Sequence, residues 1–395
     1  MSVKENLYNN VEILKDEIEN ISEFIFEHAE LGNEEYVSSA YLVEKLKDYG
    51  FKVTYPYLDI PTAFRAEYKK GEGLKVAFLP EYDALPGYGE NKNQTAHACG
   101  HNWIAATTLG AAISLATLNE NFNGTIVVIG TPAEETVGGK CELVEKSAFS
   151  DIDAVIQMHL GAENNINVLT LAMDSIEFNF SGVAAHAACY PEKGVNALDA
   201  VNLMFAGVNA LRQHMKSDAR VAGIITEGGM ACNVVPDKAS CRYYIRSKER
   251  SYLRELTQKI INCAKGAALA SGTKLEIINY ETSFANLVTN KKLMELYEKN
   301  LRSLGVTDIR DREGFGSTDM GDVSQCCPTI HPNFPLTTKH LVGHTIEFAT
   351  ATIQEEAYKG MKEACLAMAL SCLDIFEKPE ILKEIKEEFY HTFKK

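Results

Sequence analysis

A continuous apolar run at residues 124–130 limits the folds that this chain can adopt. The run reads Gly-Thr-Ile-Val-Val-Ile-Gly and lacks the polar alternation of a half-exposed strand. Such a run is typical of a strand buried on both faces of a sheet. A sheet of this kind needs helices over both faces, so the run predicts an α/β fold. With 395 residues and about 150 residues per domain, we expect two or three domains.

Three predicted strands run directly into polar side chains. The strands lie at residues 74–79, 124–130 and 154–158. The side chains that follow them are Glu81 and Asp83, then Glu134 and Glu135, and finally His159. Enzymes with α/β folds place their chemistry at the carboxyl ends of such strands. The convergence therefore predicts a site at this edge, although Glu134 and Glu135 alone could form a charged surface loop.

The segment His97-Ala-Cys-Gly-His101-Asn102 supplies further candidate ligands just before a predicted helix at about 104–118. Thiol and imidazole groups are common ligands of zinc-like ions. The glycine between Cys99 and His101 lets the backbone bend so that both side chains face one point. The alternative is a loop at a helix start with a buried thiol and a capping histidine.

The pattern of elements changes between about residues 176 and 280. Strand and helix patterns alternate there in the order β-α-β-β-α-β, which predicts an inserted ferredoxin-like α+β domain. An α/β pattern then resumes after Asn290. We therefore predict a catalytic domain formed by residues 1–173 and 284–395, with an inserted lid or dimerisation domain at 174–283. In the first domain we expect one helix over 5–29 and one long helix over about 347–376.

Five motifs occur in the order found in a known family. They are His97-Ala-Cys-Gly-His101, Glu134-Glu135, Met158-His159, Gly182-Val-Ala-Ala-His186 and Gly343-His344-Thr345. On these motifs the chain resembles the M-twenty metallopeptidase family, and most of all its amidohydrolase branch. That branch includes hydrolases of p-aminobenzoyl-glutamate and indole-acetyl-amino acids and a β-alanyl-lysine dipeptidase. The resemblance implies a metal-dependent exopeptidase-type catalytic domain with a mixed sheet and an inserted lid.

The resemblance also implies roles for single residues. The metal ligands that it implies for two divalent ions per subunit are Cys99, His101, Glu135, His159 and His344. Glu134 would act as the general base, and Asp83 would orient a ligand from behind. In the inserted domain, His186 would hold the scissile carbonyl of a neighbouring subunit's substrate, while Asn233 and Arg246 would bind the substrate's carboxylate.

We therefore expect an amidohydrolase, aminoacylase or dipeptidase that cleaves the amide bond of an N-acyl amino acid or dipeptide. A metal-activated water would attack the amide carbon, and Glu134 would take the water's proton. The mixed ligands suit zinc or manganese and also tolerate cobalt or nickel. Two alternatives stay open: a dipeptidase selective for a basic C-terminal residue, and a catalytically silent metal-containing binding protein.

Composition excludes some other classes. The formal net charge of −15 argues against a nucleic-acid partner, which needs a basic face. The sequence has no apolar run long enough to predict a membrane span, and its first residues lack the apolar segment that would predict a signal peptide. The ten cysteines are expected to be reduced thiols in a cytoplasmic protein. The expected partners are a small-molecule substrate and a second copy of the chain, joined through the inserted domain.

Overall fold

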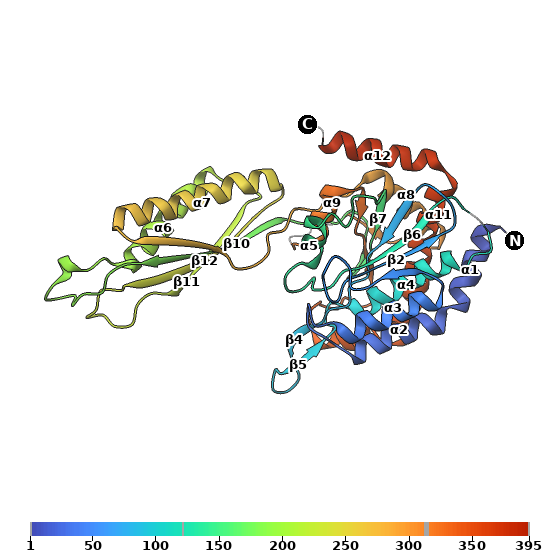
Figure 1. Ribbon diagram of the computed structural model, residues 1–395, viewed down its shortest axis with the longest axis horizontal. Helices are drawn as coiled ribbons and strands as arrows, with labels where there is room; N and C mark the ends of the chain where they lie inside the picture. The colour runs from blue at the N-terminus through green and yellow to red at the C-terminus, as the bar shows by residue number, and fades with distance from the viewer. Residues whose placement is uncertain (1, 121, 312–315, 394–395) are drawn as a thin grey trace. The chain divides into compact units, whose positions relative to one another are not determined.

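The computed structural model describes residues 2–120, 122–311 and 316–393, which form two compact units (Figure 1). The first unit contains the chain up to Leu169 and most of the chain from Leu287 onward. The second unit, called the insert here, is Thr170–Asn286 together with a short segment that ends at Gly321. Each unit has a separate hydrophobic core.

A six-stranded sheet forms the centre of the first unit, with the order β1-β2-β6-β3-β7-β15. Its strands are β1 (Lys52–Thr54), β2 (Phe64–Lys69), β3 (Lys75–Phe78), β6 (Thr125–Gly130), β7 (Ala154–Ile156) and β15 (Thr329–Ile330). Strand β6 pairs antiparallel with β2 and parallel with β3, and β7 and β15 continue the parallel part. Every residue of β6 is buried. The prediction of an α/β fold with a mixed sheet is thus confirmed.

Helices surround this sheet (Figure 1). They are α1 (Val3–Ile13), α2 (Lys15–Glu27), α3 (Tyr36–Asp48), α4 (His101–Ala116), α5 (Gly139–Glu145), α8 (Lys291–Ser303), α9 (Met320–Cys326), α10 (Ile346–Ala351), α11 (Glu355–Glu377) and α12 (Pro379–Phe393). All residues of α4 are buried, because it contacts β6 on one side and α2 and α11 on others. Trp103 fixes α4 to α11, since its indole N–H donates to the carbonyl of Ala357 at 3.0 Å. The start of α4 is therefore held firmly at the sheet edge.

Two predicted helices are each divided in the structure. The helix expected over 5–29 bends at Leu14, which ends α1 and begins α2 while keeping a helical backbone. The helix expected over 347–376 is interrupted between Ala351 and Glu355. There the Thr352 hydroxyl donates to the carbonyl of Ala349 at 2.7 Å, and Gln354 adopts an extended backbone that sets a new direction. Both predictions of a single helix were wrong, because the helical spacing of apolar residues continues across an interruption of one turn or less.

Short strands extend the sheet edge on which the candidate ligands lie. The third predicted strand ends at Ile156, and His159 instead opens a separate strand, β8 (His159–Gly161). A small sheet has the order β14-β9-β16-β8 and contains β9 (Asn164–Asn165), β14 (Ile309–Arg310) and β16 (Asn333–Pro335). A hairpin is formed by β4 (Leu85–Tyr88) and β5 (Gln94–Ala96).

The insert is a four-stranded antiparallel sheet with two helices. In chain order its elements are β10 (Ala172–Ser181), the 3-10 turn η1 (Pro191–Lys193), α6 (Ala197–Leu211), η2 (Arg212–His214), β11 (Arg220–Glu227), β12 (Lys238–Ser247), α7 (Arg250–Ser271) and β13 (Lys274–Asn279). The strand order is β11-β12-β10-β13, so β11 lies at an edge. The entering and leaving segments of the insert pair with each other, because Met173 and Phe284 exchange two backbone hydrogen bonds of 2.9 Å.

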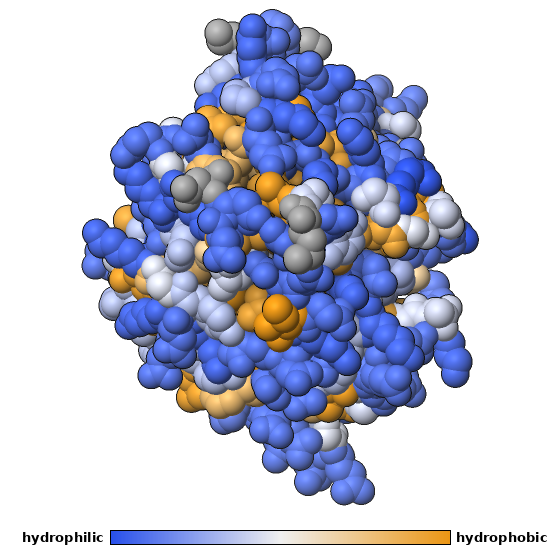
Figure 2. Space-filling model, turned by 90° about the vertical axis from the view of Figure 1, so that its right-hand side faces the viewer, coloured by the Kyte–Doolittle hydropathy of each residue, from blue (hydrophilic) through white to orange (hydrophobic). Residues whose placement is uncertain are grey.

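Hydrophilic side chains dominate the face drawn in Figure 2, and hydrophobic ones form small separate patches on it. Among the described helices, none combines the length and hydropathy needed to cross a membrane.

Candidate metal centre and active site

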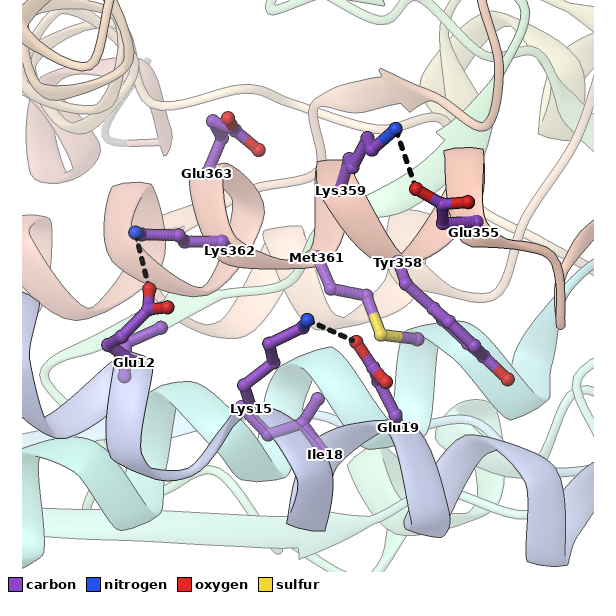
Figure 3. Close-up of a pocket in the computed structure, with 11 residues that line it drawn as sticks. Glu12, Lys15, Ile18, Glu19, Glu355, Tyr358, Lys359, Met361, Lys362 and Glu363 are labelled. Atoms are coloured by element: carbon purple, nitrogen blue, oxygen red, sulfur yellow. Dashed lines mark hydrogen bonds and ion pairs between the residues drawn. The ribbon is translucent and has the colours of Figure 1, made fainter.

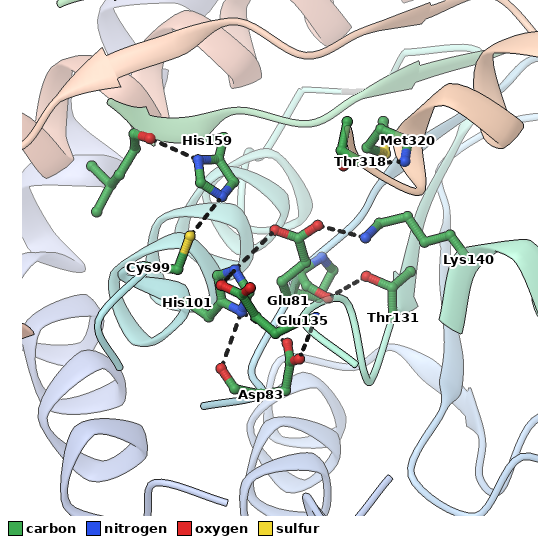
Figure 4. Close-up of polar contacts among 12 residues, drawn as sticks. Glu81, Asp83, Cys99, His101, Thr131, Glu135, Lys140, His159, Thr318 and Met320 are labelled. Carbon is green, nitrogen blue, oxygen red and sulfur yellow. Dashed lines mark hydrogen bonds and ion pairs between the residues drawn. The ribbon is translucent and has the colours of Figure 1, made fainter. Parts of the chain in front are cut away.

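Side chains from four separate loops of the first unit meet at the carboxyl ends of β3, β6 and β7 (Figure 4). Among residues of the first unit, the potential ligand atoms lie within 4.8 Å of one another in three overlapping groups. The groups are Cys99 with His101 and His159, Cys99 with Glu135 and His344, and His101 with Glu134 and Glu135. The structure thus brings together all five residues that were expected to bind metal, along with the expected base.

A glycine at the start of α4 directs His101 into this group. Gly100 has a backbone φ of +79°, a conformation that other residues rarely adopt. A Cβ atom at this position would lie 2.4 Å from Cδ1 of Leu160. The glycine therefore allows the turn between Cys99 and His101 and leaves room for the neighbouring β8.

Asp83 holds both His101 and the Glu135 backbone. Its Oδ1 lies 2.8 Å from Nδ1 of His101, and its Oδ2 accepts the backbone N–H of Glu135 at 2.9 Å. Because Nδ1 is bonded to Asp83, the Nε2 atom of His101 is the one left to bind a ligand. Burial alone would lower the pKa of His101, but the Asp83 carboxylate outweighs this and raises the pKa well above its usual value.

The turn that carries Glu134 and Glu135 is held by a buried carboxyl group behind it. Ala133 has a φ of +60°, and its N–H donates to Oε1 of Glu35 at 2.7 Å. The N–H groups of Gly138 and Gly139 close the turn on the carbonyl of Ala133. Burial, and secondarily the charge of Asp83, raise the pKa of Glu35 to about 7.

The other ligand candidates approach the group from two more loops. Nε2 of His159 lies 3.5 Å from Sγ of Cys99, and burial lowers the pKa of His159. Nε2 of His344 lies 3.5 Å from Oε1 of Glu135. His344 has a φ of +62°, and its backbone N–H donates to the carbonyl of Ala98 at 2.8 Å. The His344 side chain is 58% exposed, so the group is open to solvent on this side.

The residues present fit a metal ion. Among the buried side-chain atoms of the described residues, His101 Nε2, Glu135 Oε1 and Glu81 Oε2 have no hydrogen-bond partner. Buried polar atoms are almost always paired, so three unpaired atoms in one place are suited to binding a cation. Thiolate, imidazole and carboxylate are the ligands that zinc-like ions take in proteins. His97 is not among the grouped donors, since its Nε2 lies 3.0 Å from the carbonyl of Ile25.

Sequence reasoning gave no role to a buried ion pair beside this group. Glu81 and Lys140 are both fully buried, and Oε1 of Glu81 lies 2.5 Å from Nζ of Lys140. Burial alone would raise the pKa of Glu81, but Lys140 and the nearby histidines keep it below its usual value. The carboxylate pair Glu81 and Asp83 was visible after the first predicted strand, but nothing in the sequence marked Lys140 as buried.

The residues expected to bind substrate lie in the insert. The segments of His186 and Asn233 run antiparallel, and the Ala187 N–H donates to the carbonyl of Asn233 at 3.0 Å. Nδ1 of His186 accepts the N–H groups of Ala188 and Cys189, and both His186 and Asn233 are exposed.

Arg246 lies elsewhere in the insert, on β12. It lines a hollow of about 330 Å³ with Leu171, Arg220, Ala222 and Tyr244. Arg246 pairs in register with Arg220 of β11, so two guanidinium groups share this hollow. The structure thus brings the segments of His186 and Asn233 together. Arg246 lies apart from them in the chain, on β12, beside Arg220.

A further hollow of about 550 Å³ is formed by α1, α2 and α11 (Figure 3). Its three lysines, Lys15, Lys359 and Lys362, form ion pairs with Glu19, Glu355 and Glu12. None of its lining residues is among the potential metal ligands described above. The three lysines there are already paired with carboxylates, so this hollow offers no comparable chemistry.

Comparison with known protein families identifies the chain. The sequence pattern of peptidase family M20/M25/M40 matches residues 77–338. The chain belongs to this family. It is therefore a metal-dependent hydrolase that acts on amide or peptide bonds.

Relatives in this peptidase family cover most of the chain. The mouse (Mus musculus) Xaa-Arg dipeptidase is 38% identical over 348 residues, which is 85% of this chain and 79% of the relative. One of the polypeptides of the Escherichia coli p-aminobenzoyl-glutamate hydrolase is 29% identical, and the match covers 93% of this chain and 91% of that polypeptide.

Solved structures support the same fold for this member of the family. A Bacillus subtilis protein described as a dinuclear metal binding peptidase of the family superposes with a TM-score of 0.71, at 19% identity, over 92% of this chain and 99% of its own. An aminobenzoyl-glutamate utilization protein from Klebsiella pneumoniae gives a TM-score of 0.70, at 18% identity, over 94% of this chain and 99% of its own.

Proposed function

We propose that this hydrolase binds two divalent ions per subunit and cleaves the amide bond of a dipeptide or N-acyl amino acid. The observation that carries this proposal is the set of buried nitrogen and oxygen atoms without partners, which meet among Cys, His and Glu side chains. Cys99, His101, Glu135, His159 and His344 would hold the ions, with zinc or manganese the best match to these ligands. When bound, the ions supply Lewis acidity that polarises the substrate carbonyl and makes water more acidic.

Glu134 is the group that we assign to proton transfer. Its carboxylate lies within 4.8 Å of ligand atoms of His101 and Glu135, so it borders the reacting centre. A carboxylate that is not a ligand remains basic, so it can take a proton from the attacking water and pass it to the departing nitrogen. Asp83 keeps the His101 ring in the orientation and tautomer that leave Nε2 available.

The insert is proposed to act as a ferredoxin-like lid and dimerisation domain. We assign His186 to the scissile carbonyl, and Asn233 and Arg246 to the substrate carboxylate. In support of a dimer, the edge strand β11 exposes Ile224 and Ile225, with 64% and 45% of their surfaces accessible. An exposed apolar edge strand is a common site of pairing with a second chain. Sedimentation should give a dimer mass, and a fully active monomer would remove any role of His186 in a neighbouring subunit.

The test of function is a hydrolysis panel of dipeptides and N-acyl amino acids with zinc- or manganese-loaded protein. Glu134→Gln should reduce kcat by at least about 100-fold while metal content stays at the wild-type level. Glu142→Gln on α5, an exposed change, is the matched control and should retain activity. Wild-type turnover by the Glu134→Gln variant, or absence of stoichiometric metal from the wild-type protein, would contradict the proposal.

A second candidate is a dipeptidase selective for a basic C-terminal residue. The 38% identity to an Xaa-Arg dipeptidase favours it. The net charge of −15 would also attract a cationic substrate. In the panel, dipeptides ending in Arg or Lys should then exceed those ending in Glu in kcat/KM, and this advantage should shrink as salt is added.

A further inference from the structure

We propose that Glu81 supplies an additional carboxylate oxygen to the metal centre, and that the buried Lys140 determines which oxygen is free to do so. The inference rests on the proposed metal centre and adds a residue pair to it. Glu81 follows β3, and Lys140 is the second residue of α5, so the pair joins the loops that carry Asp83 and Glu135.

The two oxygens of Glu81 have different surroundings (Figure 4). Oε1 is 2.5 Å from Nζ of Lys140. Oε2 has no hydrogen-bond partner and lies 3.7 Å from Nε2 of His101. That nitrogen also lacks a hydrogen-bond partner, and Asp83 holds the other nitrogen of the ring. Oε2 therefore faces the atom of His101 that is left to bind metal.

A purely structural ion pair does not account for this arrangement. A buried charged oxygen without a partner has lost its hydration without replacement, which destabilises a fold. The Glu81 carboxylate also lies within 4.8 Å of the partly buried Glu134 carboxylate, and additional positive charge at this point reduces the repulsion between the two anions. A divalent ion beside Oε2 and Nε2 of His101 gives both unpaired atoms a partner and adds positive charge that Lys140, held on Oε1, does not bring to Oε2.

Lys140 has a second consequence for the centre. A carboxylate added alone would bring one more negative charge next to the Cys99 thiolate and Glu135. Because Lys140 is paired with Glu81, the centre gains an oxygen ligand while the pair as a whole carries no net charge. The bound ion would then keep the Lewis acidity that amide cleavage requires.

The test compares metal affinity with apo-protein stability. Zn²⁺ affinity is measured by competition with a chromogenic chelator, and the metal-free melting temperature is measured on the same samples. Glu81→Gln should weaken Zn²⁺ binding by about 10- to 100-fold. The double variant Glu81→Leu/Lys140→Met removes both charges at similar volume, so apo stability should be retained or increased. Its Zn²⁺ affinity should nevertheless remain as low as that of Glu81→Gln.

The controls separate this inference from the proposed function. Lys146→Met, a change near the end of the same helix, should leave Zn²⁺ affinity unchanged. Wild-type Zn²⁺ affinity in the double variant would show that the pair is only structural and would overturn the inference alone. Failure of the wild-type protein itself to bind Zn²⁺ would instead contradict the metal centre on which the inference rests.

Discussion

Replacement of Asp83 by Asn tests how the ligands are held. One oxygen of Asp83 faces Nδ1 of His101 at 2.8 Å, and the other accepts the Glu135 N–H at 2.9 Å. An asparagine offers one oxygen and one NH₂ group, so it cannot accept hydrogen bonds at both positions. If the NH₂ group faces Glu135, two donors oppose each other. If it faces His101, the ring must carry its proton on Nε2, where it blocks metal binding.

The expected loss follows from these two contacts. A hydrogen bond to a charged acceptor contributes about 1.5–3 kcal/mol, and loss of one corresponds to roughly a 10- to 100-fold change in an equilibrium constant. A 10- to 100-fold loss of metal affinity is also typical when a group that hydrogen-bonds to a metal ligand and orients it is removed. We therefore expect Asp83→Asn to weaken Zn²⁺ binding by about 10- to 100-fold.

The assay is chelator competition on metal-free protein, with melting temperature measured in parallel. Asp151→Asn is the control, because Asp151 pairs with Lys75 at the start of β3, whereas Asp83 follows the end of that strand. The control should bind Zn²⁺ as the wild type does. Unchanged Zn²⁺ affinity in Asp83→Asn, with the fold intact, would refute the reasoning that Asp83 sets the tautomer of His101.

Three further predictions follow from the site and its supports. The pKa of Glu35, about 7 against a usual 4.5, makes the wild type lose stability as pH rises from about 4.5 to 7, because the buried carboxyl must ionise. Glu35→Gln mimics the protonated form and does not ionise. In urea titrations its unfolding free energy minus that of the wild type should therefore increase by up to about 3 kcal/mol between about pH 5 and 8. A difference in unfolding free energy that stays constant over this pH range would contradict the prediction. Gly100→Ala places a Cβ against Leu160 at a positive φ, so calorimetry should show a loss of about 1–3 kcal/mol together with weaker Zn²⁺ binding. Removal of metal with EDTA should lower the melting temperature. The free energy of unfolding should rise again by about 2.7 kcal/mol when free Zn²⁺ reaches about 100 times its Kd. A melting temperature that EDTA does not change would argue against buried metal.

The sequence predicted the sheet edge at which the candidate ligands lie, because apolar runs mark where strands end. The apolar runs that became β3, β6 and β7 each lead directly to chemically distinctive side chains, and parallel strands bring such ends together. His344 is different, because no strand pattern precedes it. Its position depends on a hydrogen bond from its backbone to Ala98, a contact between distant segments that only the folded chain reveals.

The role of Lys140 was not predictable for a related reason. A lysine in a short helix is normally expected at the surface. Here α5 lies against the sheet edge so that Lys140 is fully buried opposite Glu81. Burial of a charge depends on the partner that tertiary structure brings to it, and periodicity contains no information about that partner. The break at Thr352 was missed similarly, since a side-chain cap and not a glycine or proline ends α10.

The pairing of Met173 with Phe284 affects the chain entropy of the first unit. A long disordered insertion between Leu169 and Leu287 would hold the two parts of that unit apart by an open loop. Once the insert has folded, its two ends are joined, and the connection behaves as a link of only a few residues. Loop-closure theory puts the difference on the order of 3 kcal/mol. Folding of the insert should therefore favour the return of the segment that carries His344, and so completion of the ligand set.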